Sequence, residues 1–137
     1  MCSFINTNNI FYIKGITFEL KAMTDRFSLP TICGLICDTC SWFKGENEPK
    51  CPGCSAVEGK PFWGKCKAYQ CAQEHQAEHC GVCNEFPCET AIDQYDPNRP
   101  NGPQEAIFRI GHLAIRAKIG TEEWLRRRAN NELPTFD

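Results

Sequence analysis

Ten cysteines crowded into residues 33–88 constrain this chain more than any other feature of its sequence. They form the series Cys33-x3-Cys37-x2-Cys40, Cys51-x2-Cys54, Cys66-x4-Cys71 and Cys80-x2-Cys83-x4-Cys88. Two residues between cysteines let both sulfur atoms turn towards one metal ion, and structural zinc sites favour thiolate ligands. Pro52 and Gly53 suit the tight turn that such a knuckle needs. The spacing therefore predicts a metal-binding module in which all ten cysteines are candidate ligands.

The same segment is poor in residues that build an apolar core. Residues 33–88 contain four aliphatic core-formers, Leu35, Ile36, Val57 and Val82, and six aromatic residues. Ordering a backbone costs roughly 1–2 kcal/mol per residue, whereas a structural zinc ion contributes about 10–16 kcal/mol in small peptides. We therefore expect metal, most simply two zinc ions, to hold the module together.

Ten cysteines divide into two four-thiolate sites with two left over. The first predicted site has zinc-ribbon-like spacing and consists of Cys37, Cys40, Cys51 and Cys54. The second consists of the next four cysteines, Cys66, Cys71, Cys80 and Cys83. Cys33 is an alternative ligand of the first site. Cys88 begins a helix, whose dipole favours thiolate, and is an alternative ligand of the second. His75 and His79 could also ligate, although the solvent-facing side of a short helix over 67–78 is the simpler expectation for both.

Iron is the alternative metal. The series Cys33-x3-Cys37-x2-Cys40 resembles the iron–sulfur motif of radical S-adenosylmethionine enzymes, but this chain is too short for their barrel. Thiolate sites accept zinc or iron–sulfur clusters, so a redox or electron-transfer protein stays open beside the zinc interpretation.

The first 32 residues differ from the rest. Their mildly alternating apolar stretch, residues 10–20, predicts a strand, or alternatively a leader that precedes a true start at Met23. No secretory signal pattern is present, and no apolar run reaches the length that spans a bilayer. We therefore expect a cytoplasmic protein without a membrane segment, whose cysteines serve metal or redox chemistry and not disulfides.

The last part of the chain has helical patterns. A short helix is expected to start within Phe86-Pro87-Cys88-Glu89, with Pro87 near its first position, and to run to Tyr95. A loop is expected over 96–103, and a long helix over 104–118 that ends at Gly120. In the long helix, a polar stripe is predicted to face solvent: Glu105, Arg109, His112 and Arg116. A final helix begins at Thr121, and Trp124, Leu125 and Phe136 would form an apolar partner surface if the module leaves them uncovered.

Together these features predict a small α+β fold. Residues 1–32 are an N-terminal extension, residues 33–96 an irregular metal-stabilised cysteine-rich module with zinc-ribbon-like knuckles, and residues 97–137 a helical segment that packs on the module.

Three stretches carry a family resemblance: Cys33-Gly34-Leu35-Ile36-Cys37-Asp38-Thr39-Cys40, Cys51-Pro52-Gly53-Cys54 and Cys80-Gly81-Val82-Cys83-Asn84-Glu85-Phe86-Pro87-Cys88. With the Cys66-x4-Cys71 pair, they resemble the domain-of-unknown-function 3795 family over about residues 31–96. The resemblance implies a small prokaryotic cysteine-rich metal-binding protein in the cytosol. It implies no established activity, substrate or catalytic residue.

The function expected from these observations is a zinc-stabilised binding or adaptor module for an unidentified protein partner. All-thiolate sites are closed, which suits structure more than Lewis-acid catalysis, and no phosphate loop or nucleophile–base motif points to an enzyme. Each four-thiolate zinc centre carries a charge of about −2, and residues 33–88 already contain seven acidic against five basic side chains. Nucleic-acid binding is therefore disfavoured. The oligomeric state is left open.

Overall fold

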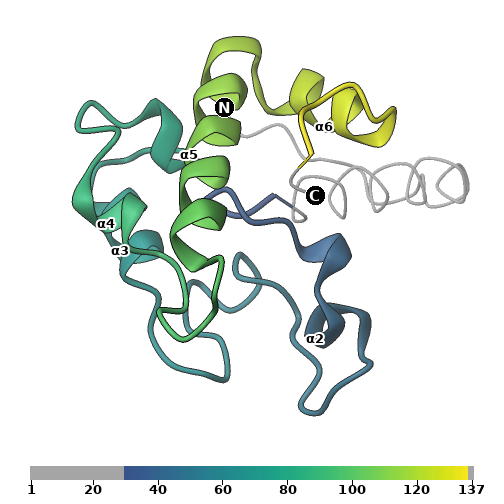
Figure 1. The fold of residues 1–137 in the computed structure, drawn as a ribbon. Coiled ribbons are helices and arrows are strands. Elements are labelled where there is room, and N and C mark those ends of the chain that lie inside the picture. The colour runs from purple at the N-terminus through teal and green to yellow at the C-terminus, as the bar shows by residue number, and fades with distance from the viewer. Residues whose placement is uncertain (1–29, 136–137) are drawn as a thin grey trace, which may run out of the picture.

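The structure is a computed structural model that describes residues 30–135 (Figure 1). The strand or leader expected within residues 1–32 lies almost wholly outside the described residues. In chain order, the elements are the 3-10 turn η2 (Cys37–Thr39), α2 (Ser41–Lys44), α3 (Lys67–Glu74), the 3-10 turn η3 (Cys80–Val82), α4 (Glu89–Ile92), α5 (Gly102–Ile119) and α6 (Thr121–Ala129).

The described part of the chain is mostly helical. Between residues 30 and 135, the β pairing consists of one isolated antiparallel bridge, which joins Pro30 to Ile36. The predicted α+β class is therefore corrected for these residues. Its physical reason is that the cysteine loops are closed by tight turns and 3-10 pieces, which satisfy backbone groups locally and leave no extended segment to pair.

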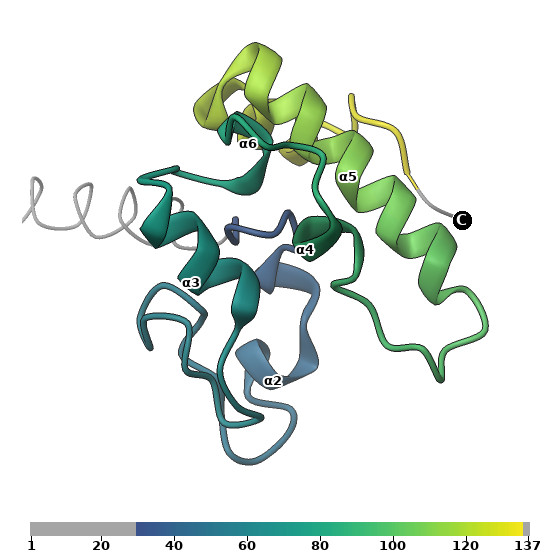
Figure 2. The same cartoon turned by 90° about the vertical axis from the view of Figure 1, so that its left-hand side faces the viewer.

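Helix α5 is the longest element and the one on which the others pack. It contacts η3, α4 and α6, while α3 contacts α4 and α2 contacts η2. Figures 1 and 2 show α6 and α2 at opposite ends of the molecule, with α5 packed beside α6. The core lies where α5 meets the cysteine loops and is formed by Cys33, Ala68, Cys80, Ala91 and Leu113.

The ends of α5 follow from its sequence. Pro103 lies in the first turn, where its missing N–H has no intrahelical partner to lose. Arg116 and Lys118 lie in the last turn, where cations favour the helix dipole, and Gly120 with φ of +85° ends the helix. The helix predicted over 104–118 is thus present and slightly longer, whereas the one predicted to reach Tyr95 stops at Ile92.

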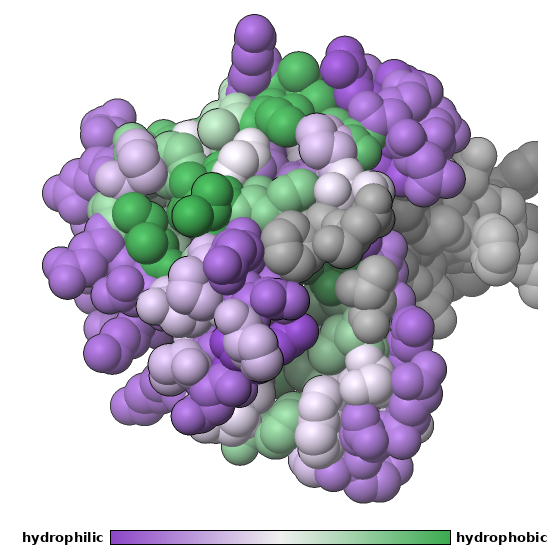
Figure 3. Space-filling view, in the orientation of Figure 1, coloured by the Kyte–Doolittle hydropathy of each residue, from purple (hydrophilic) through white to green (hydrophobic). Residues whose placement is uncertain are grey.

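The buried face of α5 differs from the predicted one. Arg109, His112 and Arg116 are 4%, 7% and 4% exposed, while Ile107 is 71% exposed. The prediction that this polar stripe faces solvent is therefore wrong. Figure 3 shows apolar residues gathered on the surface over the upper part of the molecule, beside hydrophilic ones. The α5 arginines are buried because the cysteine loops present backbone carbonyls that need hydrogen-bond donors, which these side chains supply.

Helix α6 packs against α5, and its large apolar residues are buried. Trp124 and Leu125 are buried, so they do not form the partner surface considered from the sequence, and Phe136 lies outside the described residues. Trp124 Nε1 donates to His112 Nδ1 at 3.3 Å, and His112 Nε2 lies 2.9 Å from the carbonyl of Pro134. These two partners fix His112 as the tautomer protonated at Nε2. Across residues 30–135, no helix combines the length and apolarity needed to cross a membrane.

Candidate metal centres

All ten cysteines of residues 33–88 are free thiols. Cys33, Cys37 and Cys80 are buried and the other seven are partly exposed. Their mutual electrostatic effects sort most of them into two groups, one near η2 and α2 and one near α3, η3 and α4. Cys33 acts on members of both groups.

The first thiol group consists of Cys37, Cys40, Cys51 and Cys54. Turns bring them near one another. The N–H of Cys40 donates to the carbonyl of Cys37 at 3.0 Å, which closes η2, and the N–H of Cys51 donates to Trp42 at 2.9 Å, which returns the chain to α2. Gly53, with φ of +97°, makes the turn between Cys51 and Cys54.

Burial and like charges disfavour thiolates in the first group. Burial raises the pKa of Cys37 to about 11, with further increases from the charges of Cys51, Cys40 and Cys33, while a backbone hydrogen bond from Cys54 lowers it in part. Burial likewise raises the pKa of Cys54 to about 12, followed by the charge of Cys37. Without a cation these two sulfurs hold their protons at neutral pH. A divalent ion would reverse that preference, because it compensates the charge that makes the thiolates unfavourable.

The second thiol group consists of Cys71, Cys80, Cys83 and Cys88. Helix α3 carries Cys71, Cys80 begins η3, and Cys88 is the residue that precedes α4. The N–H of Cys83 donates to the carbonyl of Cys80 at 3.1 Å, which forms the knuckle of this C-x2-C pair. Burial raises the pKa of Cys80 to about 12, and the charges of Cys33, Cys88 and Cys71 raise it further. For Cys71 the pKa is raised by desolvation and then by Cys88 and Cys83.

The two remaining cysteines lie between these groups. Cys33 belongs to the core together with Cys80, and Cys66 packs against the same core. The charge of Cys66 acts on Cys54 in the first group. The Cys33 sulfur also lies 3.3 Å from the hydroxyl oxygen of Thr31. The second group therefore contains Cys88 in the place that the sequence interpretation gave to Cys66.

The two histidines considered as ligands have different surroundings. His75 is exposed, with Nδ1 2.8 Å from the carbonyl of Cys71 and Nε2 3.4 Å from Glu85. The Cys71 carbonyl and then Glu85 raise its pKa. His79 is 1% exposed, so the prediction that it faces solvent is wrong. Its Nδ1 accepts the N–H of Gly81 at 3.1 Å, and burial, followed by the charge of Arg116, lowers its pKa to about 4.

In neither thiol group do the sulfur atoms converge on one point. Within residues 30–135, no three Cys, His, Asp or Glu side chains converge closely enough to hold an ion as they stand. The donor set nevertheless fits a soft or borderline metal, because each group offers four sulfur atoms carried by tight turns in a partly buried setting.

Buried arginines hold the loop that carries the first cysteines. Arg109 donates through Nη1 to the carbonyl of Cys33 at 2.5 Å and through Nη2 to Ala91 at 2.6 Å and Gln94 at 3.1 Å. These three acceptors are backbone carbonyls, one on the loop at Cys33 and two at the C-terminal end of α4. Sequence analysis missed this role. The available signal was that Arg109 shares its helical face with Ala106 and Leu113, at i−3 and i+4, both of which are buried.

Arg116 lies about two turns further along the same face. It donates to the carbonyl of Thr31 at 2.9 Å and to the hydroxyl of Thr121 at 2.9 Å, and it lies 3.4 Å from Glu78. Burial lowers its pKa, although Glu78 acts in the opposite direction. Arg116 therefore ties the start of the cysteine module to the turn between α5 and α6.

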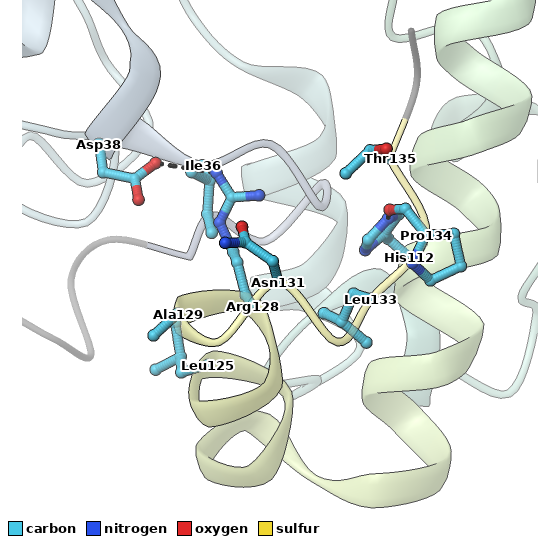
Figure 4. Close-up of a pocket in the computed structure, with 10 residues that line it drawn as sticks. All are labelled: Ile36, Asp38, His112, Leu125, Arg128, Ala129, Asn131, Leu133, Pro134 and Thr135. Atoms are coloured by element: carbon cyan, nitrogen blue, oxygen red, sulfur yellow. Dashed lines mark hydrogen bonds and ion pairs between the residues drawn. The ribbon is translucent and has the colours of Figure 1, made fainter.

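A cavity of about 540 Å³ lies between this loop, α6 and the C-terminal residues 131–135 (Figure 4). Arg128 of α6 reaches across it and pairs with Asp38 at 3.0 Å, as the dashed line in Figure 4 marks. Asp38 lies between Cys37 and Cys40, so α6 is attached directly to the first C-x2-C knuckle. The Nε of Arg128 is buried and has no hydrogen-bond partner among the described residues.

The fold and the two thiol groups define a small, mostly helical, cysteine-rich protein. Residues 29–93, slightly less than half of the chain, match the family model described as "Protein of unknown function (DUF3795)". The resemblance inferred from the cysteine motifs is thereby confirmed. The match ends before α5, although α5 supplies the arginines that hold the first cysteine loop. No similar protein was found among curated proteins or among solved structures.

Proposed function

We propose that this protein binds two zinc ions through thiolate centres and that the metal holds the cysteine module in shape as a binding or adaptor unit. One observation carries the proposal. In residues 33–88, the buried apolar core side chains are those of Cys33, Cys37, Ala68, Ala72 and Cys80. Apart from Pro61, which is buried, every aliphatic and aromatic side chain larger than alanine in this stretch is at least partly exposed.

Such a core is too small to order the segment unaided. Alanine and cysteine bury little apolar area, and apolar burial contributes about 25 cal/mol per Å². Helix α5 adds Leu113, and its arginines satisfy carbonyls, but the loops of residues 45–66 lie away from α5, beside α2 (Figures 1 and 2). Thiolate–zinc bonds would supply cross-links where apolar contacts are few.

The thiol grouping supports a particular division of ligands. The first centre takes Cys37, Cys40, Cys51 and Cys54, and the second takes Cys71, Cys80, Cys83 and Cys88. In this division Cys33 and Cys66 are not ligands; Cys33 is part of the core and Cys66 packs against it. This division differs from the sequence-based one in exchanging Cys66 for Cys88.

Elemental analysis of anaerobically purified protein tests the proposal. We expect about two zinc ions per chain, about one in each of the double variants Cys51→Ser/Cys54→Ser and Cys80→Ser/Cys83→Ser, and an unchanged content in Cys66→Ser. Cys2→Ser, which alters the one cysteine outside residues 33–88, is the matched control. Protein that carries no metal and unfolds at the same temperature with and without a chelator would contradict the proposal.

The same measurement distinguishes the alternative of an iron–sulfur or redox protein. Iron with acid-labile sulfide and broad visible absorption would favour that function. The central place of Cys33, whose charge acts on Cys37, Cys54 and Cys80, is the feature that would suit a cluster larger than one ion.

A further inference from the structure

A constrained loop presents two aromatic side chains to solvent. The N–H of Cys66 donates to the carbonyl of Gly59 at 2.8 Å and closes the base of the loop, while the N–H of Gly64 donates to Pro61 at 3.0 Å and closes its tip. Phe62 and Trp63 are the two central residues of that tip. They are 48% and 60% exposed. The loop is therefore fixed by its backbone, and its two largest side chains are left outside the core.

Two aromatic side chains from outside the loop pack against it. The ring of Trp42 lies 4.6 Å from that of Phe62, centroid to centroid, at an interplanar angle of 38°. At the base, Gly59 has φ of +72° and a Cβ there would overlap the ring of Tyr69. Glycine is thus required where the loop meets α3. These contacts make the tip a rigid platform.

The loop is also positively charged. Lys60, Lys65 and Lys67 are all exposed, and residues 59–67 include no acidic side chain. Among residues 30–135, none of these three lysines forms an ion pair. Glu58, immediately before the loop, is the one nearby carboxylate in the sequence. Lysines flank the aromatic pair along the chain: Lys60 precedes Phe62 by two residues, and Lys65 follows Trp63 by two residues.

A cavity of about 520 Å³ adjoins the loop on its α3 side. Lys60 and Lys65 line it together with Tyr69, Gln70, Gln73 and Glu58. It therefore combines two cations, one carboxylate, an aromatic ring and two amides. Cations bind phosphate, aromatic rings stack on bases, and amides form hydrogen bonds with base edges.

We propose that the loop of residues 59–66, with the cavity beside it, binds single-stranded nucleic acid. Trp63 and Phe62 stack on successive bases, and Lys60, Lys65 and Lys67 neutralise phosphates. The expectation against nucleic acid came from the summed charge of residues 33–88. The structure gathers three of the five lysines of that segment on this loop and the first residue of α3, so the local charge has the opposite sign.

An anionic membrane surface would offer the same charge, but it fits this loop less well. A bilayer is broad and nearly flat, so it would also meet carboxylates elsewhere on the acidic module. A flexible single strand can contact the loop alone. The amide of Gln70 already donates to Glu74 at 3.1 Å, whereas the amide of Gln73 in the adjoining cavity would find partners on a base but none in the acyl region of a lipid.

Fluorescence anisotropy with a labelled 15-nucleotide oligo(dT) or oligo(U) tests the proposal on the full-length, metal-loaded protein. With three phosphates neutralised, binding should weaken about 20-fold between 50 and 200 mM salt. Trp63→Ala should weaken it about tenfold and Trp63→Phe much less. Lys60→Glu/Lys65→Glu should abolish most of the binding. Lys118→Glu, an exposed lysine on the last turn of α5, is the matched control and should alter binding little.

Three results would overturn the proposal. The first is no binding at 50 mM salt. The second is binding that neither Trp63→Ala nor Lys60→Glu/Lys65→Glu weakens. The third is tighter binding to phosphatidylserine vesicles than to the oligonucleotides, with the same two variants abolishing it. Metal content and circular dichroism of each variant should match those of the unaltered protein, because all the altered side chains are exposed.

Discussion

At the scale of single residues, buried arginine satisfies the backbone carbonyls that hydrogen bonds within a β-sheet satisfy in other small proteins. Arg109 is 4% exposed and donates to three backbone carbonyls, those of Cys33, Ala91 and Gln94. Carbonyls in irregular loops lack the partners that helices and sheets provide, and leaving them buried without donors is costly. A single planar guanidinium satisfies all three and joins two segments of chain.

Replacement of Arg109 by methionine should therefore be strongly destabilising. Methionine fills similar space but leaves the carbonyls without donors, so we expect a loss of about 2–4 kcal/mol in the free energy of unfolding, measured by urea denaturation of metal-loaded protein. Arg126→Met is the control. Arg126 is exposed and pairs with Glu123 and Glu132 on the surface, so its loss should change the free energy of unfolding little. Equal effects of the two substitutions would contradict the role assigned to Arg109.

Gly34 is a second residue on which the same loop depends. Its φ is +91°, and a Cβ there would lie 2.7 Å from Cγ of Leu113, which is fully buried. We expect Gly34→Ala to lower the free energy of unfolding by about 1–3 kcal/mol, because both the backbone and the packing oppose it.

Gly111 provides the matched substitution within α5. A Cβ at this position meets no atom within 4 Å. Gly111→Ala should stabilise the protein by about 0.5–1 kcal/mol through the helix propensity of alanine. The two variants should thus shift the urea midpoint in opposite directions, and a shift in the same direction would refute the placement of the Gly34 loop against α5.

At the scale of elements, α5 shows which structural features the sequence can predict. Its position follows from hydrophobic periodicity, the proline in its first turn and the glycine at its end. Its buried face does not, because charged side chains are rarely buried and a charged stripe therefore indicates solvent. The exception arises from the loops around α5, whose unpaired carbonyls depend on their final conformations. No local pattern around Arg109 or Arg116 reveals how many such carbonyls will face them.

The orientation of α5 can be tested with one pair of truncations. Leu113 is fully buried, whereas Ile107 is 71% exposed, although both are large aliphatic residues of the same helix. Leu113→Ala should cost about 2–5 kcal/mol through lost burial and the cavity it leaves. Ile107→Ala should stay within about 0.5 kcal/mol of the unaltered protein. Thermal or urea unfolding of both variants gives the comparison, and a larger effect at Ile107 would show that the helix presents its other face.

The candidate site was predictable to a similar extent. The C-x2-C spacing identifies the knuckles, and the structure places each of these pairs on a tight turn. The grouping across the chain depends on the contact of α3 with α4 and on the packing of η3 and α4 against α5, which bring Cys88 near enough to Cys71 and Cys80 for its charge to act on both. The burial of His79 has the same origin, because its ring packs where the chain between α3 and η3 meets Arg116 of α5.

At the scale of the whole molecule, thiol chemistry and stability are linked. Burial, followed by the charges of other cysteines, raises the pKa of Cys54 and Cys80 to about 12, and burial raises that of Cys37 to about 11 despite a backbone hydrogen bond from Cys54. The unfolded chain loses these protons near pH 9. Between pH 9 and 11–12, the unfolded state therefore binds fewer protons than the folded metal-free state, and folding stability must fall as the pH rises. A metal-bound thiolate has no proton to lose in that range.

We therefore expect metal removal to change the pH dependence of stability. Urea unfolding of metal-free protein, kept reduced with a phosphine, should show a lower free energy of unfolding at pH 10 than at pH 7.5. The zinc-loaded protein should be more stable at pH 7.5 and should lose much less between the two values.

Proton release gives an independent check on the same thiols. Adding zinc to the metal-free protein at pH 7.5 should release close to four protons per ion, because a thiol is ordinarily protonated at this pH and must lose its proton to bind the metal. Release of fewer than about two protons per ion would show that the ligands are not four thiols.

The distance along the chain between the arginines and the loop they hold has a consequence for synthesis. Arg109 is 76 residues from its partner Cys33, Arg116 is 85 from Thr31, and Arg128 is 90 from Asp38. At roughly 5–20 residues per second, the ribosome needs several seconds to more than ten to make the chain between them. During that interval the cysteine loop is complete but not yet anchored, so its thiols are open to oxidants and to competing metals. Cells that make this protein should therefore gain from a reducing environment, or from a zinc donor, that acts while the chain is still growing.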